Sequence, residues 1–148
     1  MRFFLKRPEL NHKEEYLKYF NEWKGQKIVP MSSDITNMNY EDFVFQCRQR
    51  EKRENLPIDK VPASTYLLID EHGVIYGVAN LRHELYDYLL QIGGHIGYGI
   101  RPSMRGHGYA KDLLRLTLFE AKLHSIFRVL VTCDDDNIAS SKTIVACG

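Results

Sequence analysis

Apolar residues in the first half of the chain recur at helical spacing in two separate runs. The first run follows Asn11 and Glu14, which have the spacing of a capping box, and it ends near Gly25, a residue that favours a helix end. A second helix is predicted over residues 40–54, and a loop is predicted over residues 30–33 between the two helices. The inward-facing positions expected of the two helices are Tyr16, Leu17, Phe20 and Trp23 in the first, and Phe43, Val44 and Cys47 in the second.

The middle of the chain changes to short apolar runs that are separated by turn residues. Residues 65–69 and 74–79 are predicted to form a β-hairpin, because an Asp–Glu–His–Gly turn separates two apolar runs. A third strand, over about 94–100, contains several glycines, which indicates bends or the close approach of another part of the molecule. Residues 80–91 form a connector rich in tyrosine, histidine and acidic residues.

The last third of the chain predicts a loop, a helix, a strand and a final helix. After a loop over residues 102–108, one face of an amphipathic helix is formed by Ala110, Leu113, Leu114, Thr117, Leu118 and Ala121. A buried strand is predicted over 128–133, and a last helix over 138–146. The complete order of elements predicts an α/β (α+β) fold, in which a mixed sheet is flanked by helices.

Composition narrows the class of protein further. The chain has 148 residues, of which 44% are hydrophobic and 26% are charged, and its net charge is +1. These values predict one globular domain over residues 1–148 and argue against a nucleic-acid partner, which usually requires a distinctly basic surface. We expect a cytoplasmic protein without a membrane partner, because apolar runs such as Phe3–Phe4–Leu5 are too short for a membrane span or a signal peptide. No Cys or His spacing typical of a metal site is present, so we expect no metal.

The most informative segment is the glycine-containing loop over residues 105–110, between the third predicted strand and a helix. Its two glycines let the backbone turn tightly, so that successive N–H groups and the positive end of the helix dipole face one side. Arg105 adds a guanidinium that can pair with a phosphate. The loop is predicted to bind a diphosphate, and a helix start that binds nothing is the alternative reading.

Residues 97–110 resemble the acyl-CoA-binding motif of the GNAT superfamily of N-acetyltransferases. The motif has the form Arg/Gln-x-x-Gly-x-Gly/Ala, and its three defined positions are here Arg105, Gly108 and Ala110. Residues 136–140 resemble the second motif of the family, in which an asparagine starts the helix beside the pantetheine arm. The order of the predicted elements also matches. The resemblance implies a GNAT-like acyl-CoA N-acyltransferase fold that uses acetyl-CoA as co-substrate.

The resemblance also implies which residues hold acetyl-CoA. A bulged strand would bind the acetyl carbonyl and the pantetheine arm through the backbone of Tyr98, Gly99 and Ile100. The pyrophosphate would lie in the loop formed by Arg105, Gly106, His107, Gly108, Tyr109 and Ala110. Asn137 and Ser140 would hydrogen-bond the pantetheine arm or its thiol end. Strands 94–100 and 128–133 would splay apart and form the slot between them.

Acetyl transfer needs one group that removes a proton from the amine and another that protonates the departing thiolate. His95 stands near the position where family members often place a glutamate base, and a structural strand histidine is the alternative reading. The family often has a tyrosine acid on the last helix, but the matching position holds Ile144. Ser140, Ser141 or water would then protonate the thiolate, or the thiolate would leave as an anion.

The chain stops at Gly148, where the family usually continues with a final pair of strands. If the chain ends there, those strands are missing and a strand edge is left exposed. A shortened chain, a further tail and completion by a second subunit of a homodimer are the alternatives, and the sequence does not decide among them. In the connector, His83, Glu84, Tyr86, Asp87 and Tyr88 are candidates for the lining of a pocket for a cationic amine, and an exposed polar loop is the alternative reading.

The leading functional hypothesis is an N-acetyltransferase that moves an acetyl group from acetyl-CoA to a primary amine of a small molecule or peptide, by direct attack in a ternary complex. The alternative is a non-catalytic acyl-CoA-binding sensor or interaction module with a GNAT fold. A nucleotide-binding protein is a weaker third reading, because no Mg²⁺-binding Ser or Thr follows the glycines. The acceptor stays open, since one fold hosts many substrates.

Overall fold

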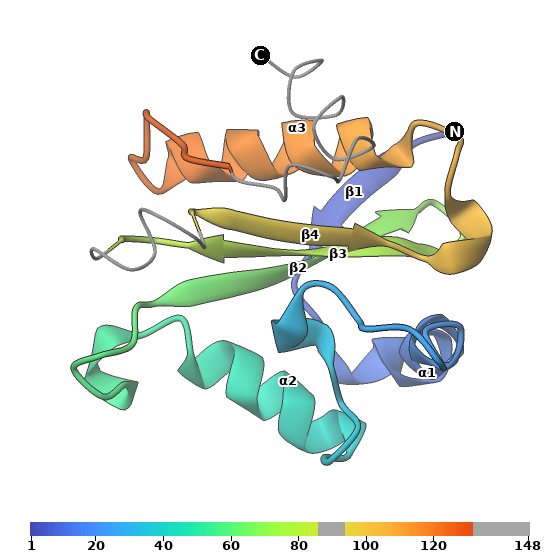
Figure 1. Ribbon diagram of the computed structural model, residues 1–148, viewed down its shortest axis with the longest axis horizontal. Coiled ribbons are helices and arrows are strands. Elements are labelled where there is room, and N and C mark those ends of the chain that lie inside the picture. Colours follow the sequence, from blue (N-terminus) through green and yellow to red (C-terminus); the bar gives the residue numbers. More distant parts are fainter. Residues whose placement is uncertain (86–93, 132–148) are drawn as a thin grey trace.

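The computed structural model describes residues 1–85 and 94–131. Its strands are β1 (Phe3–Lys6), β2 (Ala63–Asp70), β3 (Ile75–Arg82) and β4 (Ile96–Ile100). Its helices are α1 (Lys13–Asn21), α2 (Tyr40–Gln49) and α3 (Tyr109–Leu123), with short 3-10 turns at Leu10–His12, Met31–Ser33, Arg53–Asn55 and Pro102–Met104. Helices α1 and α2 lie on one side of the sheet and α3 lies on the other (Figure 1). The predicted fold class, a sheet flanked by helices, is confirmed.

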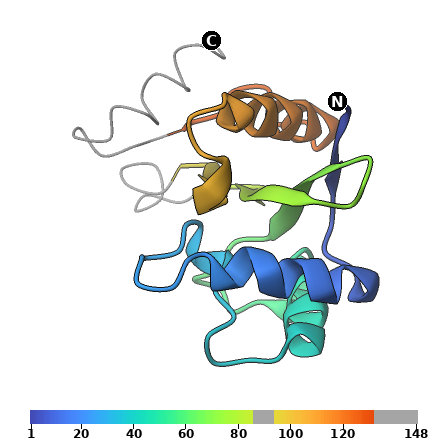
Figure 2. The same ribbon diagram turned by 90° about the vertical axis from the view of Figure 1, so that its right-hand side faces the viewer.

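The described strands form one sheet in the order β1-β2-β3-β4, and every neighbouring pair is antiparallel. The predicted hairpin corresponds to β2 and β3. The sequence does not predict β1, because a strand of four residues is too short to show alternation. In the structure, Phe3 pairs with Asp70, so this short segment forms one edge of the sheet (Figure 2).

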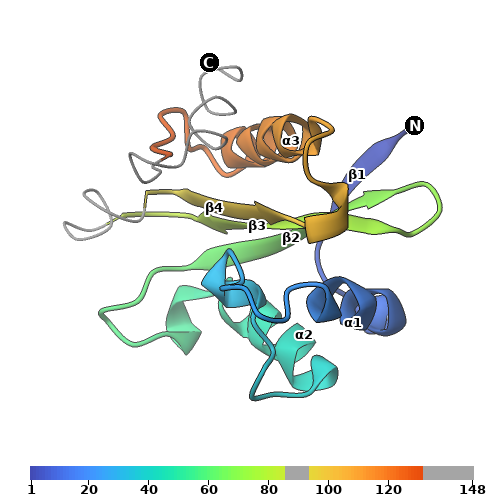
Figure 3. The same ribbon diagram turned by 45° about the vertical axis from the view of Figure 1, so that its right-hand side comes forward.

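The strand β2 is buried on both faces, because helices cover both sides of the sheet (Figure 3). Leu67 and Ile69 pack in a core with α1 and α2. Leu68 belongs instead to the core on the opposite face, where it packs with Leu113 of α3. Successive side chains of a strand point to opposite faces, so β2 joins the two cores and reads as a nearly continuous apolar run.

Helix α1 differs from the prediction in its start and in its buried face. A 3-10 turn precedes it, and the capping box is formed by Glu9 and His12 rather than by Asn11 and Glu14. Leu17 is exposed, and the buried positions are Tyr16, Tyr19 and Trp23. The helix also ends earlier than predicted, at Asn21, and turns lead from there to Gly25, which has a φ of +80°.

Helix α2 is shorter than the predicted span of 40–54, because it ends at Gln49. The chain leaves the helix at Arg50, whose carbonyl oxygen accepts a hydrogen bond of 2.9 Å from the N–H of Ala63 at the start of β2. The inward-facing prediction holds for Phe43 and Cys47, which are buried. The predicted loop before α2 contains a 3-10 turn at Met31–Ser33.

The glycines of β4 allow the connection between α1 and α2 to lie directly on the strand. A Cβ at Gly99 would overlap the carbonyl oxygen of Val29 and lie 3.3 Å from the indole of Trp23. A Cβ at Gly97 would make only an ordinary contact, 3.5 Å from Pro30. The predicted close approach is confirmed, and Val29 is the residue that approaches.

The predicted strand over 128–133 is not found in its described part, because residues 128–131 belong to no strand. Directly before β4, the N–H of His95 donates to the carbonyl oxygen of Leu130 at 2.7 Å, and Val129 and Val131 pack against the core that contains Ile96. The predicted helix over 138–146 lies outside the described residues. Within residues 1–85 and 94–131, no helix has the length and apolar character needed to cross a membrane.

Candidate functional site

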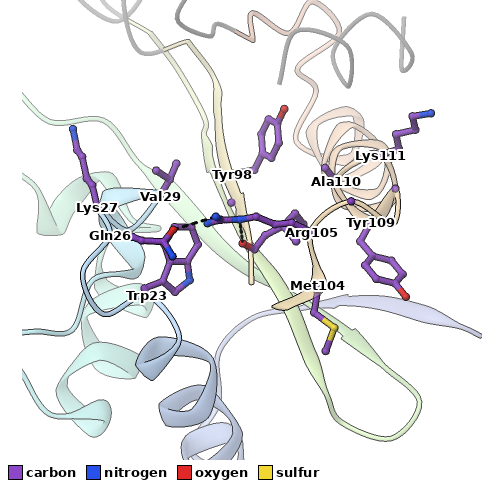
Figure 4. A pocket seen from close by; sticks show the side chains of 14 residues that line it. Trp23, Gln26, Lys27, Val29, Tyr98, Met104, Arg105, Tyr109, Ala110 and Lys111 are labelled. Carbon is purple, nitrogen blue, oxygen red and sulfur yellow. Dashed lines mark hydrogen bonds between the residues drawn. The ribbon is translucent and has the colours of Figure 1, made fainter. Parts of the chain in front are cut away.

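A cavity of about 600 Å³ lies where β4, the start of α3 and the connection between α1 and α2 meet (Figure 4). We call it the β4 cavity. Its first side, the loop wall, consists of Met104, Arg105, Gly106, Gly108, Tyr109, Ala110 and Lys111. Its second side, the indole wall, consists of Trp23, Gln26, Lys27 and Val29. Between the two walls, β4 contributes Tyr98, Gly99 and Ile100.

The loop wall ends in a helix start that is built to face an anion. Gly106 and Gly108 both have a φ of +83°, a left-handed conformation that glycine adopts without steric cost. Gly108 is also the N-cap of α3, and no side chain caps this end of the helix. The first N–H groups of a 15-residue helix therefore face the cavity with the positive end of the helix dipole, and Lys111 adds a cation in the first turn.

The edge of β4 that faces away from β3 presents backbone polar groups to the cavity. Arg101 donates its N–H to Tyr76 of β3 at 2.8 Å, and in an antiparallel pair alternate residues bond to the same neighbour. Counting back along β4, the N–H and C=O groups of Tyr98 and Ile100 point away from β3. This edge is suited to hydrogen bonds with an extended ligand that contains amides.

The predicted bulge of this strand is not found. Between Ile96 and Ile100 the register with β3 is constant, so each residue of β4 has one partner across the ladder. The described sheet has its irregularity elsewhere, between Leu68 and Ile69 of β2. The backbone groups that face the cavity are therefore presented by regular alternation and not by an inserted residue.

Arg105 reaches across the cavity instead of turning toward the glycines of its own loop. Its Nη1 donates to Oε1 of Gln26 at 3.1 Å, and its Nε donates to the carbonyl oxygen of Ile100 at 3.3 Å. The guanidinium carbon lies 4.9 Å from the ring centre of Trp23, which is a cation–π contact (Figure 4). Arg105 thus joins the loop wall, β4 and the indole wall.

A comparison with protein families identifies the family of this chain. The family model described as an acetyltransferase (GNAT) domain matches residues 2–148. This chain belongs to the GNAT acetyltransferase family. No curated protein matches the chain significantly. GNAT proteins are acyltransferases that generally use acetyl-CoA, so the β4 cavity is the candidate acyl-CoA site of this GNAT domain.

Most of the predicted cofactor-binding residues of the GNAT domain come together at this cavity. Tyr98, Gly99, Ile100 and five of the six loop residues line it, and His107 does not. The ring of Tyr109 turns into the core, 4.7 Å from the ring of Tyr76, so this residue offers its backbone to the cavity. The predicted roles of Asn137, Ser140 and Ile144 concern residues outside the described part of the chain.

His95, the predicted base, lies directly before β4 and does not line the cavity. Its Nδ1 accepts a hydrogen bond of 3.0 Å from the N–H of Leu130. A neutral imidazole that accepts at Nδ1 carries its proton on Nε2, so it has no lone pair left to take a proton from an amine. Burial lowers the pKa of His95, and the nearby Arg82 guanidinium lowers it further, which favours the neutral ring. This arrangement supports the structural reading, and the catalytic role stays a prediction.

The indole wall was not part of the predicted site. The pattern of apolar residues identifies Trp23 only as a core position, and no motif marks Gln26, Lys27 or Val29. The sequence indicates these residues only indirectly, through the length of the connection between the two helices. A connection longer than needed to join two helices is often a functional loop, and here it places four side chains opposite the loop wall.

The described part of the acidic connector lies away from the β4 cavity. The Nε2 of His83 is 2.8 Å from the hydroxyl of Ser64, and its ring centre is 4.5 Å from that of His124. Glu84 faces Arg53 at 3.7 Å. Tyr86, Asp87 and Tyr88 lie outside the described residues. In the described ranges, no three His, Cys, Asp or Glu side chains gather in a way that could hold a metal ion.

Proposed function

We propose that this GNAT protein transfers the acetyl group of acetyl-CoA to a primary amine of a small molecule or peptide, by direct attack in a ternary complex. One observation carries the proposal. The β4 cavity joins a strand edge suited to an amide-containing arm with an uncapped helix start suited to a diphosphate. Coenzyme A has both parts in sequence, a pantetheine arm with two amides followed by a pyrophosphate.

We assign each part of coenzyme A to one part of the cavity. The N–H groups at the start of α3 and the side chain of Lys111 would hold the pyrophosphate. The backbone of Tyr98 and Ile100 would pair with the amides of the pantetheine arm. Because the Ile100 carbonyl oxygen accepts from Arg105 in this structure, the guanidinium would release it as the arm binds and turn to the phosphates.

In the chemical step, the amine nitrogen attacks the thioester carbonyl. The C–N bond forms, the C–S bond breaks, and the amine proton leaves while the thiolate is released. A backbone N–H on the β4 edge would stabilise the oxyanion. Within residues 1–85 and 94–131, none of the residues that line the cavity is a carboxylate or a histidine. The amine would therefore arrive neutral or lose its proton through water, with His95 as the predicted base. Ser140 is the predicted group that protonates the departing thiolate. A thiol of pKa about 8.5 is an acceptable leaving group without a strong acid.

The alternative is an acyl-CoA-binding module without catalysis. It is favoured by the same observation, that the described lining of the cavity contains no carboxylate or histidine. Binding of acetyl-CoA is common to both functions. Only the transfer of the acetyl group to an amine distinguishes them.

The chain contains one tryptophan, Trp23, and it lies in the indole wall of the cavity. Its fluorescence therefore reports directly on this site. We expect a saturable change in Trp23 emission on titration with acetyl-CoA and no comparable change with ATP. Release of free thiol is then followed with a panel of amines that covers polyamines, amino acids and peptide amino termini. Turnover with one amine supports the enzyme, binding without any turnover supports the binding module, and absence of binding contradicts both.

A further inference from the structure

A buried guanidinium holds helix α1 against the sheet beside the β4 cavity. The side chain of Arg101, the residue after β4, is only 11% exposed. Its Nη1 lies 2.8 Å from Oε1 of Glu15, and its Nε lies 2.5 Å from Oε2 of Glu22. The same Nη1 donates to the carbonyl oxygen of Ile75 in β3 at 3.2 Å. We call Arg101, Glu15 and Glu22 the arginine clasp.

The two carboxylates of the arginine clasp also accept hydrogen bonds from backbone N–H groups. Oε1 of Glu15 accepts the N–H of Ile75 at 3.1 Å. Oε1 of Glu22 accepts the N–H of Ser103 at 2.9 Å, inside the 3-10 turn Pro102–Met104. The clasp therefore connects four parts of the chain, which are α1, β3, the end of β4 and the turn that leads into the loop wall.

Both walls of the β4 cavity begin at the arginine clasp. Glu22 directly precedes Trp23 of the indole wall, and Ser103 lies two residues before Arg105 of the loop wall. The two walls meet again where the guanidinium of Arg105 lies over the indole. The clasp therefore fixes the separation of the walls at their base, and the contact of Arg105 with Trp23 joins them across the cavity.

The charge of the clasp fits a supporting role and not a ligand site. Two carboxylates face one guanidinium, so the cluster does not attract an anionic ligand. Burial alone would raise the pKa of Glu22, but hydrogen bonds from Arg101 and Ser103 hold that pKa below its ordinary value. Ion pairs withdrawn from water contribute little net stability, and they fix geometry where each charge is fully hydrogen-bonded.

We infer that Arg101 and Glu22 are positioning residues, which set the spacing between the loop wall and the indole wall and thereby the affinity for acyl-CoA. The inference rests on the proposed function, because it assigns a role in binding the same co-substrate. Arg101 and Glu22 do not touch the ligand. They act through Ser103 on one wall and through Trp23 on the other.

The test uses Glu22→Gln, which keeps the size of the side chain and removes its charge. We expect the Kd for acetyl-CoA, measured by Trp23 fluorescence, to rise roughly tenfold, a typical coupling between linked sites. Hydrogen exchange at the amide of Ser103 is expected to become faster. In an amine assay, KM for acetyl-CoA is expected to rise while kcat at saturation stays unchanged. Arg101→Lys is the second variant, since one ammonium cannot serve both carboxylates in the geometry of a guanidinium.

The matched control is Glu41→Gln. Glu41 of α2 forms an exposed ion pair with Lys13 of α1, with 2.8 Å between Oε2 and Nζ, and the substitution removes this pair. Its Kd for acetyl-CoA is expected to equal that of the wild type. An unchanged Kd in both Glu22→Gln and Arg101→Lys overturns the inference and leaves the proposed function standing, even if thermal stability falls. Failure of both variants to fold also overturns it, since the clasp then holds the fold and not the spacing. Absence of acetyl-CoA binding in the wild type removes the proposed function and the inference together.

Discussion

The two walls of the β4 cavity recognise a ligand in different ways. The loop wall offers mainly backbone, because two left-handed glycines and an uncapped helix start turn N–H groups toward the cavity. The indole wall offers side chains, namely an indole, an amide and an ammonium group. A substitution in the loop wall therefore acts when it changes the backbone conformation, whereas one in the indole wall acts by removing or displacing a contact.

The largest effect is expected where the indole wall rests on β4. In Gly99→Ala the new methyl group would overlap the carbonyl oxygen of Val29, so the wall must shift. We expect the free energy of unfolding to fall by about 3 kcal/mol or more, the upper end for an overpacked core, because the overlap is with backbone. Acetyl-CoA binding is expected to weaken as well. Urea denaturation measures the first effect and Trp23 fluorescence the second.

Gly97→Ala is the control on the same strand and the same face, because its methyl group would meet Pro30 at an ordinary 3.5 Å. Its stability is expected to be close to that of the wild type. Equal losses in the two variants would mean that strand propensity, and not the contact with Val29, decides the outcome.

The next effect concerns Arg105, the side chain that joins the two walls. Arg105→Ala removes the contacts with Trp23, Gln26 and Ile100, and it also removes a cation that can pair with phosphate. We expect acetyl-CoA binding to weaken by about 1.5–3 kcal/mol, the range for hydrogen bonds to charged groups. Isothermal titration calorimetry provides the measurement.

Arg105→Lys is expected to fall between the wild type and Arg105→Ala, since lysine keeps the charge but not the planar fork. Tighter binding in Arg105→Ala would contradict the assignment. It would show that the guanidinium only bridges the two walls in the absence of ligand and makes no favourable contact with bound acetyl-CoA.

A smaller effect is expected at the backbone of the loop wall itself. Gly108→Ala meets no atom within 4 Å, but it places a Cβ on a residue with a φ of +83°. This conformation costs roughly 1–2 kcal/mol for an alanine. Gly73→Ala, in the β2–β3 hairpin, has the same free space and a φ of +82°. Both variants are expected to lose similar stability, and only Gly108→Ala is expected to lose acetyl-CoA affinity in the fluorescence titration.

The smallest effect concerns pH and His95, which lies outside both walls. The pKa of His95 is lowered in the folded state, so the unfolded chain takes up its proton first as the pH falls below the ordinary value of 6.5. Its contribution to stability is therefore complete above pH 6.5 and is lost as the pH falls toward the folded pKa. His95→Asn keeps an acceptor for Leu130 without a titrating group. It is expected to reduce the loss of unfolding free energy between pH 7.5 and pH 5, measured by urea denaturation.

His12 and His83 also have lowered pKa values, so part of this pH dependence is expected to persist in His95→Asn. A large loss of turnover in His95→Asn, with stability and acetyl-CoA affinity preserved, would instead support the predicted catalytic role.

The loop wall could be predicted from the sequence because consecutive residues form it. Glycines beside a helix start restrict the backbone locally, so residues 105–110 carry their own signal. The indole wall could not be predicted, since its four residues face β4 only after α1 has packed on the sheet. The arginine clasp could not be predicted either. The chain has 20 Lys and Arg residues and 19 Asp and Glu residues, and no pattern among them pairs Arg101 with Glu15 and Glu22.

The pairing of β1 with β2 has a consequence for the order in which the chain is synthesised. Phe3 pairs with Asp70, so β1 leaves the ribosome before its partner strand and must wait for residues more than sixty positions behind it. At a translation rate of roughly 5–20 residues per second, this delay lasts several seconds. During that time Phe3 and Leu5 have no sheet to cover them. The nascent chain is therefore most exposed to misassociation just before β2 emerges, and slower translation of residues 7–62 would prolong that interval.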